Sequence, residues 1–431
     1  MQPGRAVSDS VAGSFGGRMT GTDTQNQSCV IVGASHAGAQ LALSLRRDGW
    51  EGAIVLIGEE DCLPYHRPPL SKDYLSGSKS FESILIRKAD AYEKAGVDVR
   101  LGVRVEAIDR QAKSLALSTG ETLAYDKLAL AIGARVRTIP VPGLDKAGVY
   151  GLRTVADIAG IQNAASGAGK AVIVGGGYIG LETAASLRKM GLEVTVLEML
   201  PRVLGRVTAP EVAAFYTRVH REEGVEILTG AGVSEIVGGG AVAAVRCADG
   251  SEHPADLVIL GTGIVPNVEL AEAAGLEVGN GIVVDACART SDPDIVAAGD
   301  CTFHPSALYG GDVRLESVQN ATDQAKTASA TICGKPEPYA ALPWFWSDQF
   351  DLKLQIAGLS QGYDDLVIRG DIAGSRSFSA WYFAGEKLLA VDAVNDTRSF
   401  MLAKKLLTTG TPVNKSIIAD PAADLKTSLL G

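Results

Sequence analysis

The sequence predicts an α/β fold with two doubly wound domains, in which parallel strands alternate with helices, and a smaller α/β domain at the C-terminal end. Two glycine-rich turns, at Gly33 and Gly175, each follow an apolar strand and precede a helix. Beyond about residue 335 the pattern changes to short strands that follow one another. A chain of 431 residues is too long for one hydrophobic core and fits two or three domains.

The composition is typical of a soluble globular protein, with 46% hydrophobic residues, 21% charged residues and 50 glycines. No apolar run reaches the roughly 18–20 residues that a membrane-spanning helix needs. A net charge of −10 without a basic stripe argues against nucleic acid as a partner. The six cysteines form no C-x-x-C pair, so we expect reduced thiols and a cytoplasmic protein.

The first 27 residues are rich in Gly, Ser, Thr and Gln and show no apolar periodicity. A transit peptide would carry arginines such as Arg5 and Arg18, but it would also show an amphipathic helix pattern. We therefore predict that residues 1–27 are a disordered extension and that regular structure begins at Ser28.

The first glycine turn lies in residues 28–38, which read S-C-V-I-V-G-A-S-H-A-G. Gly33 permits a tight turn, Gly38 lets the helix pack on the strand, and the amides at the helix N-terminus can accept a pyrophosphate. Ser35 stands where the middle glycine is usual, so this turn alone fits an ordinary βαβ unit equally well. Glu59 follows the next predicted strand, where an adenosine ribose would present its hydroxyls.

The second glycine turn is more specific, because residues 171–180 read A-V-I-V-G-G-G-Y-I-G. Gly175, Gly177 and Gly180 complete the G-x-G-x-x-G spacing. Glu198 ends the next predicted strand, close to the expected separation of about 20 residues from the first glycine. This pattern predicts a second dinucleotide-binding unit.

Glu198 also bears on which nucleotide binds. A carboxylate can accept two ribose hydroxyls but repels a 2′-phosphate, by about 4 kcal/mol per unit charge at about 4 Å and an effective dielectric constant near 20. Arg202, four residues further on, could soften that repulsion. The sequence therefore favours NADH over NADPH.

A third strand ends in a motif that suits a flavin. Residues 295–301 read I-V-A-A-G-D-C, and an aspartate at the position of Asp300 can bind the ribityl hydroxyls of FAD. We therefore assign FAD to the first unit and NADH to the second. The strand-and-glycine segments 127–135 and 256–267 fit the two crossings between the units.

These assignments predict the domain organisation, with a Rossmann-like NAD-binding domain inserted into a Rossmann-like FAD-binding domain. We expect residues 28–139 and 260–334 to form the FAD-binding domain and residues 140–259 the NAD-binding domain. Residues 335–431 would form a small C-terminal α/β domain. In it, short strands are expected within residues 352–391 and a helix over 398–407.

With these residues in place, the chain resembles the FAD-dependent, NADH-oxidising ferredoxin reductases of the putidaredoxin and aromatic-ring dioxygenase systems, which have a glutathione-reductase-like fold. The resemblance runs from Ser28 to about Leu425, and it implies that the C-terminal domain covers the flavin. The segments that carry it are L-P-Y-H-R-P-P-L-S-K (Leu63–Lys72), G-G-G-Y-I-G-L-E (Gly175–Glu182), P-W-F-W-S-D-Q (Pro343–Gln349) and V-N-D-T-R-S-F-M-L-A-K-K (Val394–Lys405). Ser35 and Thr397 are mild departures from the family's pattern.

The resemblance implies three catalytic residues: Lys72 near the reactive flavin ring, Glu182 paired with it, and Trp346 beside the flavin. As ordinary side chains, Lys72 would be a surface charge, and Trp344 and Trp346 would be part of a β-domain core. The residues expected to bind FAD are Gly33, Ser35, His36, Ala37, Gly38, Glu59, Arg67, Lys72, Ala131, Arg135, Asp300, Val318 and Trp346. Those expected to bind NAD are Gly175, Gly177, Tyr178, Ile179, Gly180, Glu198 and Gly263. No metal site is predicted, because the histidines lack ligand spacing with cysteines or acids.

The activity that the resemblance implies is hydride transfer from NADH to FAD and then single-electron transfer to a [2Fe–2S] ferredoxin. That ferredoxin would serve a haem monooxygenase or a Rieske-type oxygenase. We expect a monomer or weak dimer that binds neither nucleic acid nor membrane. A basic patch for the acidic ferredoxin is expected among Arg314, Lys387, Arg398, Lys404 and Lys405.

Three other activities use the same fold. A disulfide reductase needs a redox cysteine pair soon after the first βαβ unit, and residues 65–72 contain no cysteine. An NADH oxidase or peroxidase needs one cysteine there, and Cys62 lies before that motif. A redox interaction protein like apoptosis-inducing factor shares P-Y-x-R-P-P-L-S-K, but it would carry nuclear-targeting basic clusters, which this sequence lacks.

Overall fold

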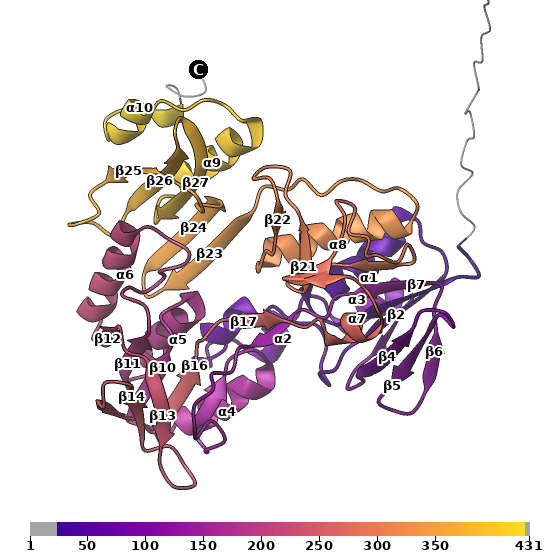
Figure 1. Ribbon diagram of the computed structural model, residues 1–431, viewed down its shortest axis with the longest axis horizontal. Coiled ribbons are helices and arrows are strands. Elements are labelled where there is room, and N and C mark those ends of the chain that lie inside the picture. Colours follow the sequence, from indigo (N-terminus) through magenta and orange to yellow (C-terminus); the bar gives the residue numbers. More distant parts are fainter. Residues whose placement is uncertain (1–23, 427–431) are drawn as a thin grey trace, which may run out of the picture.

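The computed structural model describes residues 24–426, and its first domain is built on a parallel five-stranded sheet with the strand order β20-β7-β1-β2-β3 (Figure 1). These strands are β1 (Ser28–Val32), β2 (Ala53–Ile57), β3 (Val97–Arg100), β7 (Lys127–Leu130) and β20 (Ile295–Ala297). Alternate residues face opposite sides, as the period of a strand requires. On one face, Ile31 and the residues paired with it on neighbouring strands, such as Leu56, pack on helices α1 (His36–Asp48) and α8 (Val318–Ile332). On the other face, Val30 and the residues paired with it, such as Val55, pack on an antiparallel sheet of β4 (Val105–Asp109), β5 (Ser114–Leu117) and β6 (Thr122–Ala124).

Short elements complete the first domain. They are η1 (Pro68–Ser71), α2 (Phe81–Ile84), α3 (Ala89–Lys94), α7 (Glu269–Ala273), β18 (Val278–Gly279), β19 (Gly281–Val283), β21 (Thr302–Pro305) and β22 (Asp312–Val313).

A second domain is inserted between β7 and β20 of the first. Its parallel sheet has the order β12-β11-β10-β16-β9 and contains β9 (Val149–Gly151), β10 (Lys170–Val174), β11 (Glu193–Glu198), β12 (Val225–Thr229) and β16 (Leu257–Leu260). One face packs on α4 (Val155–Ala165), α5 (Tyr178–Lys189) and α6 (Pro210–Glu222). The other face packs on β13 (Val233–Val237), β14 (Ala244–Cys247) and β15 (Glu252–Pro254).

The chain passes between the two domains along β8 (Ala134–Val136) and β17 (Ile264–Pro266), which pair as an antiparallel ribbon. The sequence predicts crossings in segments 127–135 and 256–267, because in each a strand is followed by a glycine. β8 begins in the first of these segments and β17 lies in the second. The domain boundaries at 139/140 and 259/260 stay predictions.

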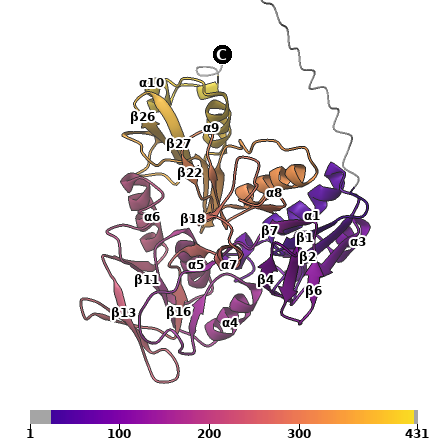
Figure 2. The same cartoon turned by 45° about the vertical axis from the view of Figure 1, so that its right-hand side comes forward.

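The C-terminal domain is an antiparallel sheet with the order β23-β24-β27-β26-β25. Its elements are β23 (Trp344–Gln349), β24 (Leu352–Gly358), β25 (Asp365–Gly370), β26 (Phe378–Ala384), β27 (Lys387–Val394), α9 (Thr397–Thr409) and α10 (Lys415–Ala419). One face of the sheet is covered by α9. The other shares a continuous hydrophobic cluster with α5 and α6, in which Phe378 packs against Phe215 at a ring-centroid distance of 4.8 Å. The C-terminal domain is thus joined to the inserted domain by a buried core (Figures 1 and 2).

Residues 24–27 correct one expectation from the sequence. Thr24 is buried, its hydroxyl accepts the amide of Glu51 at 2.9 Å, and the carbonyl of Gln27 accepts the amide of Ala53 at 2.9 Å. These four residues therefore belong to the fold and not to a disordered extension. Hydrogen bonds of this kind leave no hydrophobic pattern, which is why the sequence did not reveal them. Residues 1–23 lie outside the described part of the chain.

Candidate functional site

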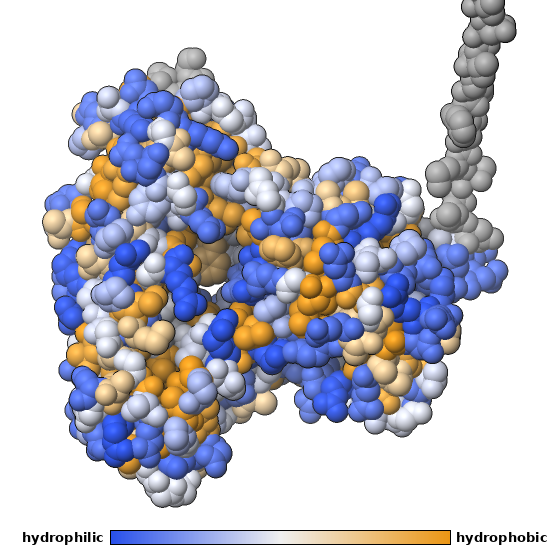
Figure 3. Space-filling view, viewed as in Figure 1, coloured by the Kyte–Doolittle hydropathy of each residue, from blue (hydrophilic) through white to orange (hydrophobic). Residues whose placement is uncertain are grey.

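A cavity of about 2070 Å³ lies where the three domains meet, and the molecular surface is hollowed near the centre of Figure 3. Ligand pockets usually measure about 300–1,000 Å³, so this cavity has room for two large ligands. Of the predicted site residues, all of which lie in the described part of the chain, only Gly38 and Gly180 do not line it.

Gly38 and Gly180 act inside the fold. A Cβ on Gly38 would lie 1.9 Å from the carbonyl oxygen of Gly33, and one on Gly180 would lie 2.1 Å from that of Gly175. Only glycine therefore lets α1 and α5 approach their strands this closely. This is the packing role of the third glycine in such fingerprints, without ligand contact.

The first glycines hold the tight turns. Gly33 has φ of +111° and a Cβ there would lie 2.1 Å from the carbonyl oxygen of Ala131, while Gly175 has φ of +109° and would meet the carbonyl oxygen of Gly261 at 2.4 Å. Gly177 differs, because a Cβ there would meet nothing within 4 Å and would point into open space. The second turn thus leaves room for a ligand directly against the backbone.

The N-termini of α1 and α5 are open to anions. Their N-cap residues, Ser35 and Gly177, make no side-chain cap, so the first helical amides have no side-chain partner there. The positive end of each helix dipole therefore faces the cavity with free donors, which fits a pyrophosphate in each half.

Glu198 is fixed at the end of β11 in the inserted domain. Its Oε2 accepts the amide of Gly176 at 2.7 Å and its Oε1 accepts that of Leu200 at 2.7 Å. Arg202 does not line the cavity and donates instead to the carbonyls of Gly205 and Thr208. The expectation that Arg202 could soften the charge of Glu198 is therefore not supported by its geometry.

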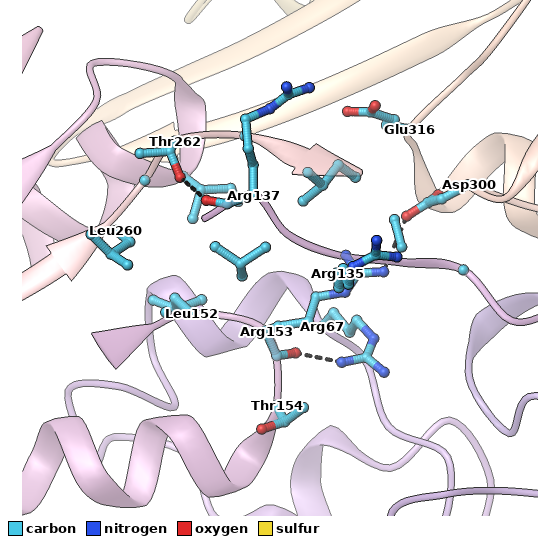
Figure 4. A pocket seen from close by; sticks show the side chains of 18 of the residues that line it. Arg67, Arg135, Arg137, Leu152, Arg153, Thr154, Leu260, Thr262, Asp300 and Glu316 are labelled. Atoms are coloured by element: carbon cyan, nitrogen blue, oxygen red, sulfur yellow. Dashed lines mark hydrogen bonds and ion pairs between the residues drawn. The ribbon is translucent and has the colours of Figure 1, made fainter. Parts of the chain in front are cut away.

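A cluster of charges occupies the first domain's side of the cavity (Figure 4). Arg153 Nη2 lies 3.2 Å from Asp300 Oδ2, and Arg67 donates to the carbonyl of Arg153, to Ser35 Oγ at 3.1 Å and to Glu60 Oε1 at 2.9 Å. Burial lowers the pKa of Arg153, with nearby Asp300 opposing that shift. Two guanidinium groups beside the N-terminus of α1 fit the phosphates of a dinucleotide.

Lys72 and Glu182 form an ion pair in the cavity wall. Lys72 Nζ lies 2.6 Å from Glu182 Oε2, and the hydroxyl of Ser71 donates to the same oxygen at 2.5 Å. The Glu182 side chain is only 2% exposed, so its charge depends on these donors. Lys72 comes from the end of η1 and Glu182 from α5, so the pair joins the first and inserted domains.

Trp346 reaches the cavity from β23, whereas Trp344 does not line it and packs towards the core of the C-terminal domain. The two rings lie 5.5 Å apart with an interplanar angle of 30°. Trp344 in turn makes a cation–π contact with Lys404 of α9, whose Nζ lies 4.9 Å from the ring centroid. Aromatic contacts therefore run from the cavity to a surface helix.

Cys62 is the one cysteine of residues 24–426 that lines the cavity. All six cysteines of the chain are free thiols. Burial raises the pKa of Cys62 to about 11, with Glu60 and Asp61 adding to the shift. Within residues 24–426, no group of three or more His, Cys, Asp or Glu side chains is placed to hold a metal ion. His36 and His66 contact each other at 3.3 Å, and burial, aided by His66 and nearby arginines, lowers the pKa of His36 to about 3.

Comparison with known proteins agrees with this geometry. Residues 27–325 match the profile of the pyridine nucleotide-disulphide oxidoreductases, and residues 344–429 match that of the reductase C-terminal domain. The chain belongs to the pyridine nucleotide-disulphide oxidoreductase family.

Its similarity to individual members extends over nearly the whole chain. Putidaredoxin reductase of Pseudomonas putida is 45% identical over 407 residues, which are 93% of this chain and 96% of that protein. Rhodocoxin reductase of Rhodococcus erythropolis is 42% identical over 403 residues, which are 93% of this chain and 94% of the relative. The crystal structure of putidaredoxin reductase in a covalent complex with putidaredoxin superposes with a TM-score of 0.91 at 44% identity and covers 94% of this chain and 100% of its own.

These findings confirm the predicted fold class and the resemblance drawn from the motifs. They also confirm an oxidoreductase that uses FAD and NAD(H). The donor set fits both groups, since each half of the cavity offers a glycine turn, an uncapped helix N-terminus and a strand-end carboxylate.

Sequence reasoning missed three residues of the site. Arg153 stands just before Thr154, which begins α4 with a capping box, and that signal marks a helix start but not a cavity. Ser71 and Ser347 contact Glu182 from segments far away in the sequence. Both serines lie within segments that carry the family resemblance, Leu63–Lys72 and Pro343–Gln349, but the resemblance assigned a role to neither.

Proposed function

We propose that this protein is an NADH-dependent ferredoxin reductase. The observation that carries the proposal is the single cavity in which both glycine turns, the Lys72–Glu182 pair and Trp346 meet. The overall reaction would convert one NADH and two oxidised ferredoxins into NAD⁺, a proton and two reduced ferredoxins. Relatives named for putidaredoxin and rhodocoxin support this type of acceptor.

In the first domain, the residues around α1 would hold FAD. The amides at Ser35 and the guanidinium groups of Arg67 and Arg153 suit its phosphates, and Asp300 suits its ribityl hydroxyls. Glu59 is 73% exposed at the edge of the cavity, where it would meet the adenosine ribose. Bound FAD supplies a ring that accepts a hydride and releases electrons one at a time.

In the inserted domain, the turn before α5 would hold NADH. The open backbone at Gly177 admits the pyrophosphate, and Glu198 would accept the adenosine ribose hydroxyls. Glu182 holds the Lys72 ammonium beside the space between the two glycine turns, where the flavin and nicotinamide rings would meet. Positive charge there favours a reduced flavin. Trp346 closes that space from the C-terminal domain and excludes water from the reacting groups.

The acceptor surface would lie on α9. Arg398 and Lys405 are exposed on this helix, and Lys404 covers Trp344, whose ring contacts Trp346. An acidic ferredoxin docked there would face a short aromatic route to the cavity. Arg314 is a poorer candidate, because it is ion-paired with Glu316 and its side chain is only 16% exposed.

The [2Fe–2S] ferredoxin of a haem monooxygenase or a Rieske-type oxygenase is the acceptor we propose. A NADH oxidase is the alternative that Cys62 favours, since this thiol lines the cavity. Its raised pKa keeps it protonated near neutral pH, which makes it a weak nucleophile.

Turnover with different acceptors tests the proposal. Acid precipitation of the purified protein should release FAD, and NADH should reduce a [2Fe–2S] ferredoxin much faster than it reduces oxygen or peroxide. Equal or faster turnover with oxygen, abolished by Cys62→Ser, would instead establish an oxidase. A protein that neither contains nor rebinds FAD would refute both activities.

A cytoplasmic monomer or weak dimer stays a prediction. Within residues 24–426, no helix combines the length and apolar character needed to span a membrane.

A further inference from the structure

Glu182, in the inserted domain, receives hydrogen bonds from both of the other domains. Lys72 and Ser71 of the first domain donate to its Oε2, and Ser347 of the C-terminal domain donates to its Oε1 at 2.6 Å. Glu182 itself belongs to α5 of the inserted domain, against which β23 packs (Figure 1). The carboxylate of Glu182 therefore connects the three domains through hydrogen bonds in the cavity wall.

Behind Ser347, the hydrogen bonds continue away from the cavity. Gln349 Nε2 donates to Ser347 Oγ at 3.1 Å, and Gln349 Oε1 lies 2.8 Å from Nε2 of His220, on α6. Ser347 and His220 are fully buried, and Gln349 is nearly so. The His220 ring also packs edge-on against Phe350, at 5.0 Å between centroids.

The direction of every hydrogen bond in this chain follows from the chemistry at its two ends. An ionised Glu182 can only accept, so the Ser347 hydroxyl donates to it and must accept from the Gln349 amide. The Gln349 carbonyl then accepts from His220, which fixes the proton of that ring on Nε2. His220 Nδ1 has no partner, and burial lowers the pKa of His220 to about 4, so the ring is neutral as this order requires.

We propose that Ser347, oriented by Gln349 and His220, is a positioning residue for the Lys72–Glu182 pair. This inference rests on the proposed function of that pair in hydride transfer. A glutamate has three rotatable side-chain bonds, and a donor on each oxygen leaves its carboxylate one orientation. Without Ser347, Oε1 is left in a buried site without its donor, and the carboxylate can turn away from Lys72.

The binding of the C-terminal domain to the rest of the molecule does not depend on this contact. The interface contains a broad apolar cluster, in which Phe378 and Tyr382 pack on α6. Tyr382 and Asp392 also bond to Thr208 of the inserted domain at 2.9 and 2.6 Å. Loss of one hydroxyl from Ser347 should therefore leave the domain in place.

The test compares Ser347→Ala with Ser379→Ala as a matched control. Ser379 is equally buried in the same sheet, and its hydroxyl accepts from Trp381 at 3.0 Å, with no link to Glu182. In FAD-loaded Ser347→Ala, anaerobic reduction by NADH should slow about tenfold while the KM for NADH stays unchanged. The control should keep the wild-type rate.

A second readout does not depend on NADH. The midpoint potential of the bound FAD, measured with a chemical reductant, should become more negative in Ser347→Ala, because a displaced Lys72 stabilises the reduced ring less. Ser347→Thr keeps the hydroxyl at a strand position and should restore both values. Gln349→Met removes only the bond behind Ser347 and should produce a smaller change in the same direction.

Several outcomes would overturn the inference. Unchanged rate and potential in Ser347→Ala, equal losses in Ser379→Ala, or a Thr variant that behaves like Ala would each show that Ser347 only fills space. If wild-type FAD is not reduced by NADH, the proposed function fails, and the potential still decides the role of Ser347. Should Ser347→Ala not fold, the potential of Gln349→Met decides it.

Discussion

Glu198, at the end of β11, is the residue on which we expect the choice of nucleotide to depend. Two backbone amides, from Gly176 and Leu200, each bind one of its oxygens, so the carboxylate has a fixed orientation. Its remaining lone pairs can accept two ribose hydroxyls, whereas a 2′-phosphate would meet a negative charge. Arg206 also lines the cavity and, among the lining cations, is the one nearest to Glu198 in the sequence, so it is the candidate to offset that charge.

We therefore expect kcat/KM to favour NADH over NADPH by at least about 100-fold, or roughly 2.7 kcal/mol. Glu198→Gln removes the charge but keeps an oxygen for a backbone amide, and it should narrow the preference about tenfold, mainly by improving NADPH. Steady-state kinetics with both nucleotides measures this. Equal use of NADH and NADPH by the wild-type protein would refute the role of Glu198.

The Lys72–Glu182 pair and Arg153 show what the sequence can and cannot predict of the site. Lys72 and Glu182 lie within motifs, so the resemblance brought them together, and the structure places them 2.6 Å apart. Their catalytic role stays a prediction. Arg153 lies outside these motifs, and Ser347 lies within Pro343–Gln349 but was assigned no role. Both reach the site because distant segments meet in space, and local residue patterns contain no information about such contacts.

The turn before α5 is the element that joins fold and binding. Its two glycines face different surroundings, since a Cβ at position 175 would meet a carbonyl oxygen at 2.4 Å and one at position 177 would meet nothing within 4 Å. The same element therefore contains one glycine required by the backbone and one that leaves space for a ligand.

This difference predicts opposite phenotypes for two similar variants. Gly175→Ala must strain a residue with φ of +109° and should lower the free energy of unfolding by about 1–3 kcal/mol or more. Gly177→Ala should unfold like the wild type but bind NADH at least several-fold more weakly, because its methyl group occupies cavity space. Thermal unfolding and NADH titration distinguish the two. A stable Gly175→Ala, or unchanged NADH binding in Gly177→Ala, would contradict the assignment.

Elements were predicted well where one apolar period dominates. The strand predicted before Glu59 and the strand predicted to end at Glu198 are found as β2 and β11. The helix predicted over 398–407 is found as α9, with ends that differ by no more than two residues. The strand β23 was not predicted as a strand, because W-F-W-S-D-Q has three aromatic residues followed by three polar ones and shows no alternation, and its two buried positions are the polar Ser347 and Gln349. Its aromatic residues serve the cavity and the domain core at once.

His220 links α6 to the chain of hydrogen bonds at the domain interface. Burial depresses its pKa from 6.5 to about 4, so protons bind more tightly to the unfolded state. Its contribution to stability is therefore present above about pH 6.5 and is lost as the pH falls towards 4. From pH 8 to pH 5 we expect a loss of about 2 kcal/mol from this group. Urea unfolding of the wild type and of His220→Gln at both values measures it, and an equal loss in the variant would exclude His220 as the cause.

At the scale of the whole molecule, each of the three domains contributes different residues to one cavity. The first and inserted domains each supply a glycine turn, and the C-terminal sheet supplies Trp346 and the hydroxyl that holds Glu182. The two fingerprints predicted the contributions of the first two domains, the family resemblance implied that of Trp346, and the contact of Ser347 with Glu182 was not predicted. The shared core between the C-terminal sheet and α6 was not predictable, because it depends on how complete domains pack.

The arrangement of the domains also assigns the two proposed half-reactions, reduction of FAD by NADH and electron transfer to ferredoxin, to different surfaces of the protein. We expect NADH to bind the inserted domain, whereas the proposed ferredoxin surface on α9 lies on the far side of the C-terminal sheet from α5 and α6. The protein has a net charge of −10, so attraction to an acidic partner must come from a local group of cations. Arg398, Lys404 and Lys405 provide one on a single helix.

Replacing these three cations on α9 by glutamine should slow ferredoxin-coupled turnover and flatten its dependence on salt, because screening acts on long-range charge pairs. Anaerobic reduction of the bound FAD by NADH should keep its wild-type rate in the same variant. The matched control replaces Arg87, Lys88 and Lys94, which are exposed around α3 of the first domain, and should leave both reactions and the salt dependence unchanged. Stopped-flow flavin reduction and ferredoxin-coupled turnover at several salt concentrations measure the two reactions. A fall in both half-reactions would assign these cations to folding or cofactor binding, and an equal effect in the control would show that only the net charge of the protein matters.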